Sequence, residues 1–243
     1  MNKERRIGDL YQSETRYYRN RMSGGPLRWD EKPETYKTYP DAETIELPEP
    51  NLSAGKPIWD ILSQRRSIRD YTSAPVSMET LSQLLWAIQG VTARMGPYAL
   101  RSAPSAGALY PIETYVLVNR VANLDAGVYH YDVRQHRLEV VRKGDFGEEA
   151  ARAGLGQEML ENAALAFIWT AVIERSKWKY RERAYRYIYM DAGHIGQNAY
   201  LAAEALGLGC CTVGAFFDDE VNAVIGVDGE SETAVYLCSI GKR

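Results

Sequence analysis

The chain has 243 residues, of which 45% are hydrophobic and 25% are charged, and its formal net charge is -3. These are the proportions of a globular protein, and the charge excludes both the basic footprint of a nucleic-acid-binding protein and a polybasic membrane anchor. No apolar run reaches the about 18 residues of a membrane-spanning helix, and the N-terminus lacks the apolar core of a secretory signal, so we expect a cytoplasmic protein.

The N-terminal part of the chain differs from the rest, because it is polar, rich in tyrosine and proline, and poor in hydrophobic periodicity. We predict an arm over residues 1–55 that packs on the surface or on a partner subunit, followed by one domain over residues 56–243. Within the arm, prolines restrict residues 35–50, so we expect no regular element there.

Regular structure is predicted to begin with two helices. Pro57 suits the start of the first, where its missing N–H has no cost. Ser77 is the expected N-cap of the second helix, and Gly90 is expected to end it.

Strands and helices then mix without strict alternation. Strands are predicted at 113–118, 127–141 (two around a turn), 165–173 (central), 210–216 and 233–241. Helices are predicted at 147–155, 157–164, 181–209 (long, or a broken pair) and 218–226 with Asp218 or Asp219 as its cap. This order favours an α+β fold over a doubly wound sheet.

Two segments carry residues suited to a phosphate or a flat ligand. RRSIRDY (65–71) places Arg65, Arg66 and Arg69 around Ser67, which suits a phosphate; the alternative is a solvated basic face. In RSAPSAGALYP (101–111), small side chains let the backbone approach a ligand, with Ser105 and Gly107 as the expected contacts; the alternative is a tight turn.

A third segment, SKWKYRERAYRY (176–187), contains Lys179 and Tyr180, which can move protons when placed against a substrate; the alternative is an amphipathic, solvent-facing helix start. His194 is expected to be structural, and His130 and His136 to lie at the surface beside a turn. No group of side chains has metal-ligand spacing, so we predict no metal site.

Three cysteines, Cys210, Cys211 and Cys238, show no disulfide pattern, and we expect small buried residues. Cys210 and Cys211, if in a strand, would point to opposite faces. The phosphate-binding, dinucleotide-binding and hydrolase motifs GxGxxG, Walker A, GxSxG and HExxH are all absent.

Taken in order, these segments resemble the nitroreductase superfamily, and within it the SagB-type (ThcOx-like) dehydrogenases, the oxidases of thiazole- and oxazole-forming peptide synthesis. The resemblance spans nearly the whole chain. The similar segments are ETRYYR (14–19), YKTYP (36–40), ELPEP (46–50), RRSIRDY (65–71), RSAPSAGALYPIETYVLV (101–118), GVYHYD (127–132), KY (179–180), DAGHIGQNAYLAAEALGLG (191–209), VGAF (213–216) and SIGKR (239–243).

The resemblance implies an α+β fold with a central, mainly antiparallel sheet wrapped by helices, in an interlocked homodimer with FMN at the interface. Each site would then use both chains. The implied cofactor-binding residues are Arg65, Arg66, Ser67 and Arg69 at the phosphate, ribityl chain and ring edge, Pro104, Ser105 and Gly107 of the partner subunit, Val213, Gly214 and Ala215 along the isoalloxazine, and Lys242 and Arg243 at the phosphate.

The resemblance also implies roles for Lys179 and Tyr180, which match the catalytic Lys-Tyr pair of the azoline dehydrogenases. Lys179 would be the base that removes a ring proton while hydride passes to flavin N5. The cofactor would carry the hydride chemistry, and the protein would supply placement and electrostatics.

Several functions stay open at this point. The chain could oxidise an azoline ring on a modified peptide, although that synthesis needs a cyclodehydratase partner and these residues show no leader-recognition domain. It could reduce nitro compounds or quinones with NAD(P)H, or bind FMN without catalysis behind the tyrosine-rich arm. A structural domain without cofactor is disfavoured by the density of cations at Arg65, Arg66, Arg69, Lys242 and Arg243.

Overall fold

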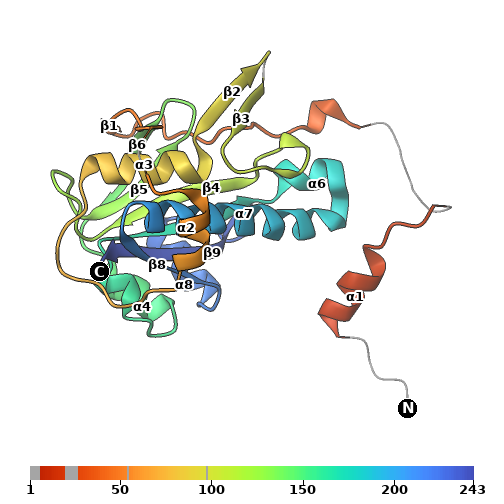
Figure 1. Ribbon diagram of the computed structural model, residues 1–243. Coiled ribbons are helices and arrows are strands. Elements are labelled where there is room, and N and C mark those ends of the chain that lie inside the picture. The colour runs from red at the N-terminus through yellow and green to blue at the C-terminus, as the bar shows by residue number, and fades with distance from the viewer. Residues whose placement is uncertain (1–5, 20–26, 54, 97) are drawn as a thin grey trace.

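The computed structural model describes residues 6–19, 27–53, 55–96 and 98–243. Among these residues, a seven-stranded sheet forms the centre of the molecule, in the order β1-β6-β5-β4-β7-β9-β8 and with antiparallel pairing throughout (Figure 1). The strands are β1 (Thr44–Glu46), β4 (Ile112–Val118), β5 (Gly127–Asp132), β6 (Arg137–Lys143), β7 (Leu165–Val172), β8 (Leu208–Val213) and β9 (Glu232–Lys242). The α+β prediction and the central position of β7 are confirmed.

Helices cover both faces of this sheet. One face packs against α3 (Met78–Gln89) and the long α7 (Ala184–Ala205), and the other packs against α4, α5 and α8. The remaining helices are α1 (Ile7–Glu14), α2 (Ile58–Gln64), α4 (Gly147–Ala153), α5 (Met159–Asn162), α6 (Glu174–Tyr180) and α8 (Asp218–Ile225), with short 3₁₀ turns at Trp29–Glu31, Ala106–Ala108 and Arg181–Arg183.

Local sequence signals explain several of these boundaries. The Ser77 side chain accepts a hydrogen bond from the Thr80 N–H at 3.2 Å, and α3 ends at Gly90, as predicted. Cys210 and Cys211 separate into the cores on opposite faces of the sheet, also as predicted. The predicted aspartate cap of α8 is wrong, because Phe217 occupies that position. Asp218 is instead the first residue of the helix, where its carboxylate is still stabilised by the helix dipole.

Two short β elements were not predicted. Strand β1 lies within the proline-rich stretch 35–50 and pairs with β6 at the edge of the sheet, where a strand of three residues needs few donors. The hairpin of β2 (Val91–Met95) and β3 (Tyr98–Arg101) projects from the body (Figure 1). Four of the five β2 residues are exposed, so the segment lacks the alternation by which a strand is recognised.

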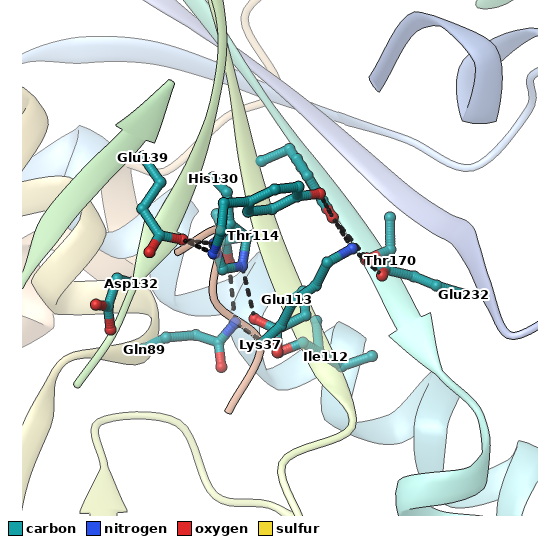
Figure 2. Close-up of polar contacts among 12 residues, drawn as sticks. Lys37, Gln89, Ile112, Glu113, Thr114, His130, Asp132, Glu139, Thr170 and Glu232 are labelled. Atoms are coloured by element: carbon teal, nitrogen blue, oxygen red, sulfur yellow. Dashed lines mark hydrogen bonds and ion pairs between the residues drawn. The ribbon is translucent and has the colours of Figure 1, made fainter. Parts of the chain in front are cut away.

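Buried charges hold residues 34–39 of the arm on the sheet, and Figure 2 shows Lys37 directed at Glu232. Lys37 Nζ lies 2.7 Å from the Tyr115 hydroxyl and 2.5 Å from a Glu232 carboxylate oxygen. The Tyr39 N–H donates to Glu139 at 3.1 Å, and Arg175 Nε of α6 donates to the Glu34 carbonyl at 2.8 Å. The arm therefore supplies partners for buried polar side chains of the sheet, Glu139 and Glu232 among them, and together these groups form a buried polar layer.

His130 lies at the middle of this layer, so its predicted surface position is wrong. Its ring is fully buried, with Nε2 at 3.1 Å from Glu113 and Nδ1 at 2.9 Å from Glu139. Glu113 also forms an ion pair with Arg175 of α6. His136 is half-buried between Tyr131 and Ser82, at 2.7 and 2.8 Å, so it too is not a free surface residue.

The stability of the protein is expected to fall as the pH rises from about 6.5 to about 9. Burial opposes the charge on His130, but its hydrogen bonds to Glu113 and Glu139 raise its pKa to about 9. An unfolded histidine titrates near pH 6.5, so between these values the folded state holds a proton that the unfolded chain has lost. The free energy of unfolding should decline by about 3 kcal/mol across this window.

Urea unfolding at a series of pH values checks this expectation. The His130→Gln variant should show a flatter dependence, because it has no proton to lose. His194→Gln, which replaces an exposed histidine on α7, should retain the wild-type dependence. Equal slopes in the wild type and in His130→Gln would contradict the assignment.

Candidate functional site

The predicted phosphate-binding arginines lie along the edge strand β8. The Ile68 N–H donates to the Cys210 carbonyl at 2.9 Å, and the Thr72 N–H donates to the Lys242 carbonyl at 2.8 Å. Gly209 and Gly241 permit this approach, since a methyl group on either would lie within 3.0 Å of a neighbouring side chain. The segment RRSIRDY is thus brought beside the end of β9, although 170 residues separate Thr72 from Lys242.

Tyr200 of α7 organises part of this segment. Its hydroxyl lies 2.8 Å from the Ser67 Oγ and accepts from the Thr212 N–H at 3.0 Å. The Arg65 guanidinium lies 4.9 Å from the centre of the Tyr200 ring. Sequence reasoning missed Tyr200, because helical spacing alone gives a tyrosine on α7 no distinguishing feature.

The cations at this edge differ in their pairing. Arg243 pairs with Glu204 at 2.6 Å, and Lys56 pairs with the same carboxylate at 3.1 Å. Although burial acts in the opposite direction, these two cations lower the pKa of Glu204. In the described part of the chain, no carboxylate lies within 4.0 Å of the charged groups of Arg65, Arg66, Arg69 or Lys242.

Guanidinium and ammonium groups without a carboxylate partner fit a dianionic phosphate, which arginine recognises with paired hydrogen bonds. Beyond the end of β8, Gly214 and Ala215 are exposed. Val213 is buried in the core that faces α8, so only its backbone is available to a ligand.

Lys179 and Tyr180 lie at a different place, at the end of α6 and over the turn that contains Gly107. A methyl group on Gly107 would lie 2.5 Å from the Tyr180 hydroxyl oxygen and 2.9 Å from the Lys179 Nζ. Both side chains are half-buried, whereas Pro104 and Gly107 are exposed. The structure therefore brings together a proton-transfer pair and a turn that were predicted separately.

Asp191 of α7 holds this turn from the inner side. Its carboxylate accepts hydrogen bonds from the Ser105 hydroxyl at 2.5 Å and from the Ala106 N–H at 3.2 Å. Burial raises the pKa of Asp191, and the two hydrogen bonds only partly offset this effect. Ser105 donates its proton to Asp191, so it can only accept from a cofactor. Sequence reasoning missed Asp191, which carries no local signal.

Aromatic and basic side chains surround the pair. The rings of Tyr180 and Tyr187 lie 4.7 Å apart, and Arg183 donates to the Tyr187 hydroxyl at 3.0 Å. Two arm residues approach here: the Arg183 guanidinium lies 4.3 Å from the Tyr17 ring, and Trp29 lies 5.4 Å from Trp178, as measured between ring centres. The arm thus flanks α6.

The arginine group around Ser67, which Tyr200 contacts, and the Lys179–Tyr180 group, whose turn Asp191 holds, lie at separate points of one chain. Asp191 and Tyr200 are nine residues apart on α7, which corresponds to about 14 Å along the helix axis. The arginine group and the Lys179–Tyr180 group therefore do not form one compact cluster within a chain.

In the described residues, no three His, Cys, Asp or Glu side chains are placed to hold a metal ion. No helix of the described part of the chain is long and apolar enough to cross a membrane.

Comparison with known proteins places the chain in a family. Residues 62–242 match the model of the nitroreductase family. The protein MJ1384 of Methanocaldococcus jannaschii, named as a nitroreductase, is 37% identical over 201 residues, which are 83% of this chain and 98% of that protein.

Two other comparisons cover only part of the matched protein. The trifolitoxin-processing protein TfxB of Rhizobium leguminosarum bv. trifolii is 38% identical over 145 residues, which are 58% of this chain and 39% of that protein. A crystal structure of a protein from Anabaena variabilis described as a nitroreductase has a TM-score of 0.80 and 31% identity, over 96% of this chain and 46% of the other. Together with the antiparallel sheet and its helices, these matches confirm the resemblance found in the sequence: the chain belongs to the nitroreductase family.

Proposed function

We propose that this protein is an FMN-dependent oxidoreductase that oxidises a heterocyclic ring, with an azoline on a modified peptide as the substrate class. The observation that carries the proposal is the meeting of the Lys179 Nζ and the Tyr180 hydroxyl over Gly107. A base and a hydrogen-bond donor side by side suit a reaction that removes a proton from the ring.

FMN is the cofactor that the chain's residues fit. Its phosphate needs several cations, and Arg65, Arg66, Arg69 and Lys242 are free of carboxylate partners in the described part of the chain. Arg243, held by Glu204, would complete the phosphate site. Ser67 and the backbone of Val213, Gly214 and Ala215 would lie along the ribityl chain and ring. When bound, FMN supplies a hydride acceptor.

The protein's own groups then divide the proton chemistry between them. Burial, Tyr187 and Asp191 all raise the pKa of Tyr180, so its phenol keeps its proton and can donate a hydrogen bond to a ring heteroatom. Lys179, in its neutral form, can accept the ring proton. Each site should combine the arginine group of one chain with the Pro104, Ser105 and Gly107 turn of the partner subunit.

A homodimer is therefore part of the proposal, and exposed side chains on two helices support it. Trp59 of α2 is 77% exposed, and Tyr189 and Met190 of α7 are 58% and 54% exposed. Since α2 packs against α7, these side chains belong to neighbouring elements. Apolar groups of this size are commonly covered by a second subunit.

The first test is an absorbance spectrum of the purified protein, with the released chromophore identified by mass. Flavin bands and a mass matching FMN, at one per chain, are expected. A colourless protein that also takes up no added FMN would refute the proposal. Oxidation of a thiazoline-containing peptide, followed as a mass loss of two hydrogens, then tests the substrate class.

A second function is favoured by a separate observation. MJ1384, which matches over nearly its whole length, is named as a nitroreductase. Reduction of nitro compounds or quinones by NAD(P)H needs only an open flavin face and no base. The Lys179→Met variant separates the two, because it should lose ring oxidation and keep quinone reduction.

A further inference from the structure

One buried carboxylate differs from the others in the described part of the chain. Six acidic side chains there are buried, and five of them have a cationic or imidazole partner within 4.0 Å: Glu113, Asp132, Glu139, Glu204 and Glu232. Asp191 is only 4% exposed and has none. His194, one turn further along α7, interacts with it from a greater distance. A buried carboxylate without a cationic partner is costly, and groups of this kind cluster at functional sites.

The hydrogen bonds of the Asp191 carboxylate go to one turn of the chain, at Ser105 and Ala106. The carboxylate accepts from the Ser105 hydroxyl and the Ala106 N–H, and the Ser105 oxygen accepts in turn from the Tyr110 N–H at 2.9 Å. This turn has an unfavourable backbone, because Ala108 and Tyr110 have φ values of 53° and 48°. Left-handed conformations of such residues persist only where the surroundings hold them.

The turn lies between a small pocket and the proposed catalytic pair. A small cavity behind it is lined by Gln89, Pro104, Ser105, Tyr110 and Asp191. On its outer side, Gly107 meets the Lys179 Nζ and the Tyr180 hydroxyl. Any displacement of the turn would therefore change the surface on which these two groups rest.

We propose that Asp191 is a positioning residue: its carboxylate holds the Ser105–Gly107 turn against Lys179 and Tyr180, and so fixes where these two groups meet the substrate. This inference rests on the proposed function. Asp191 does not touch the reacting atoms and acts through Ser105 and Ala106.

The test compares Asp191→Asn with Glu182→Gln. Both variants convert a carboxylate to an amide, but Glu182 is exposed. Its one ion pair within the described residues is with Lys177, at 3.6 Å. An asparagine offers one acceptor oxygen in place of two, so one of the two hydrogen bonds to the turn is lost. We expect kcat for thiazoline-peptide oxidation to fall about 10- to 100-fold with KM within about twofold, since small misplacements of catalytic groups have effects of this size. Because Ser105 and Gly107 also belong to the proposed FMN site, FMN content is measured on the same samples and kcat is given per bound FMN.

Two readouts do not depend on turnover. Amide hydrogen exchange in residues 104–111 should be faster in Asp191→Asn than in Glu182→Gln. The pKa of Tyr180 is obtained by subtracting the tyrosinate titration of a Tyr180→Phe variant from that of its parent. In the Asp191→Asn background this pKa should be lower than in the wild-type background, because Asp191 raises it in the native protein. If Asp191→Asn does not fold, Ser105→Ala removes the same hydrogen bond from the other side.

The outcomes separate the two proposals. Faster exchange in 104–111 together with a lower kcat per bound FMN supports the positioning role. Exchange and kcat equal to those of Glu182→Gln overturn it. If the wild type binds no FMN, the proposed function fails, and exchange and the Tyr180 titration still decide whether Asp191 holds the turn and biases Tyr180.

Discussion

Replacing Lys179 with methionine is expected to lower kcat for ring oxidation by about 10²- to 10⁴-fold, the usual contribution of a positioned general base. Methionine keeps an unbranched apolar stem but has no group that can accept a proton. Lys179 is half-buried and rests on the Gly107 turn, so the fold and the FMN content should remain unchanged. Steady-state kinetics on a thiazoline-containing peptide, with flavin content measured on the same samples, checks the result.

Lys177→Met is the matched control. Lys177 lies on the same helix, two residues earlier, and forms a weak ion pair with the exposed Glu182 at 3.6 Å. Such pairs contribute about 0–1 kcal/mol to stability. Lys177 is not among the residues nearest to Gly107, which are Lys179 and Tyr180. We expect kcat within about twofold of the wild type, as for a surface change far from the reacting groups. A similar loss in both variants would reject Lys179 as the base.

Replacing Glu113 with glutamine is expected to lower the free energy of unfolding by about 3–5 kcal/mol, as breaking a buried ion pair from one side does. Burial alone would raise the pKa of Glu113, but Arg175 and His130 together lower it to about 2. The neutral amide leaves the buried Arg175 guanidinium without its counter-charge. Urea unfolding at pH 7 measures the loss.

Glu43→Gln provides the comparison for this change. Glu43 pairs with Lys143 at 2.7 Å, but both side chains are 61% exposed. Water screens such a pair, so the expected loss is about 0–1 kcal/mol. If the Glu113 variant lost no more stability than the Glu43 variant, the buried layer would not hold the protein together.

The buried layer also connects the arm to the candidate site. Arg175 of α6 contacts both Glu113 of β4 and the Glu34 carbonyl of the arm, and α6 ends at Tyr180. The position of the Lys179–Tyr180 pair therefore depends on an ion pair made by Arg175, one helical turn before Lys179. Loss of activity in Glu113→Gln would follow from this connection and not from a role in the chemistry.

Elements that rest on local patterns could be predicted from the sequence. The Ser77 cap, the end of α3 at Gly90 and the apolar run of β7 each depend on residues close together in the chain. The order of motifs was sufficient to identify the family. The weakly patterned hairpin β2–β3 and the short strand β1 were missed, because their pairing depends on contacts that local propensity does not encode.

The site residues divide in the same way. Arg65, Ser67, Lys179 and Tyr180 could be selected by residue type and motif, but nothing local indicated that Gly107 would lie beneath the last two. Asp191 and Ser105 are 86 residues apart, and Lys37 and Glu232 are 195 residues apart. A charged residue is expected at the surface unless its partner is known, and its partner is known only once the chain has folded.

The same reason explains the error at His130. In GVYHYD a histidine beside a turn has the polarity of a surface residue, and only the arrival of Glu113 and Glu139 from the neighbouring strands makes its burial favourable. Family, fold class and most helices and strands thus follow from the chain's own local order. The tertiary structure alone decided which charges are buried together and which turn supports the proposed catalytic pair, because desolvated charges are stable only when distant segments bring their partners to them.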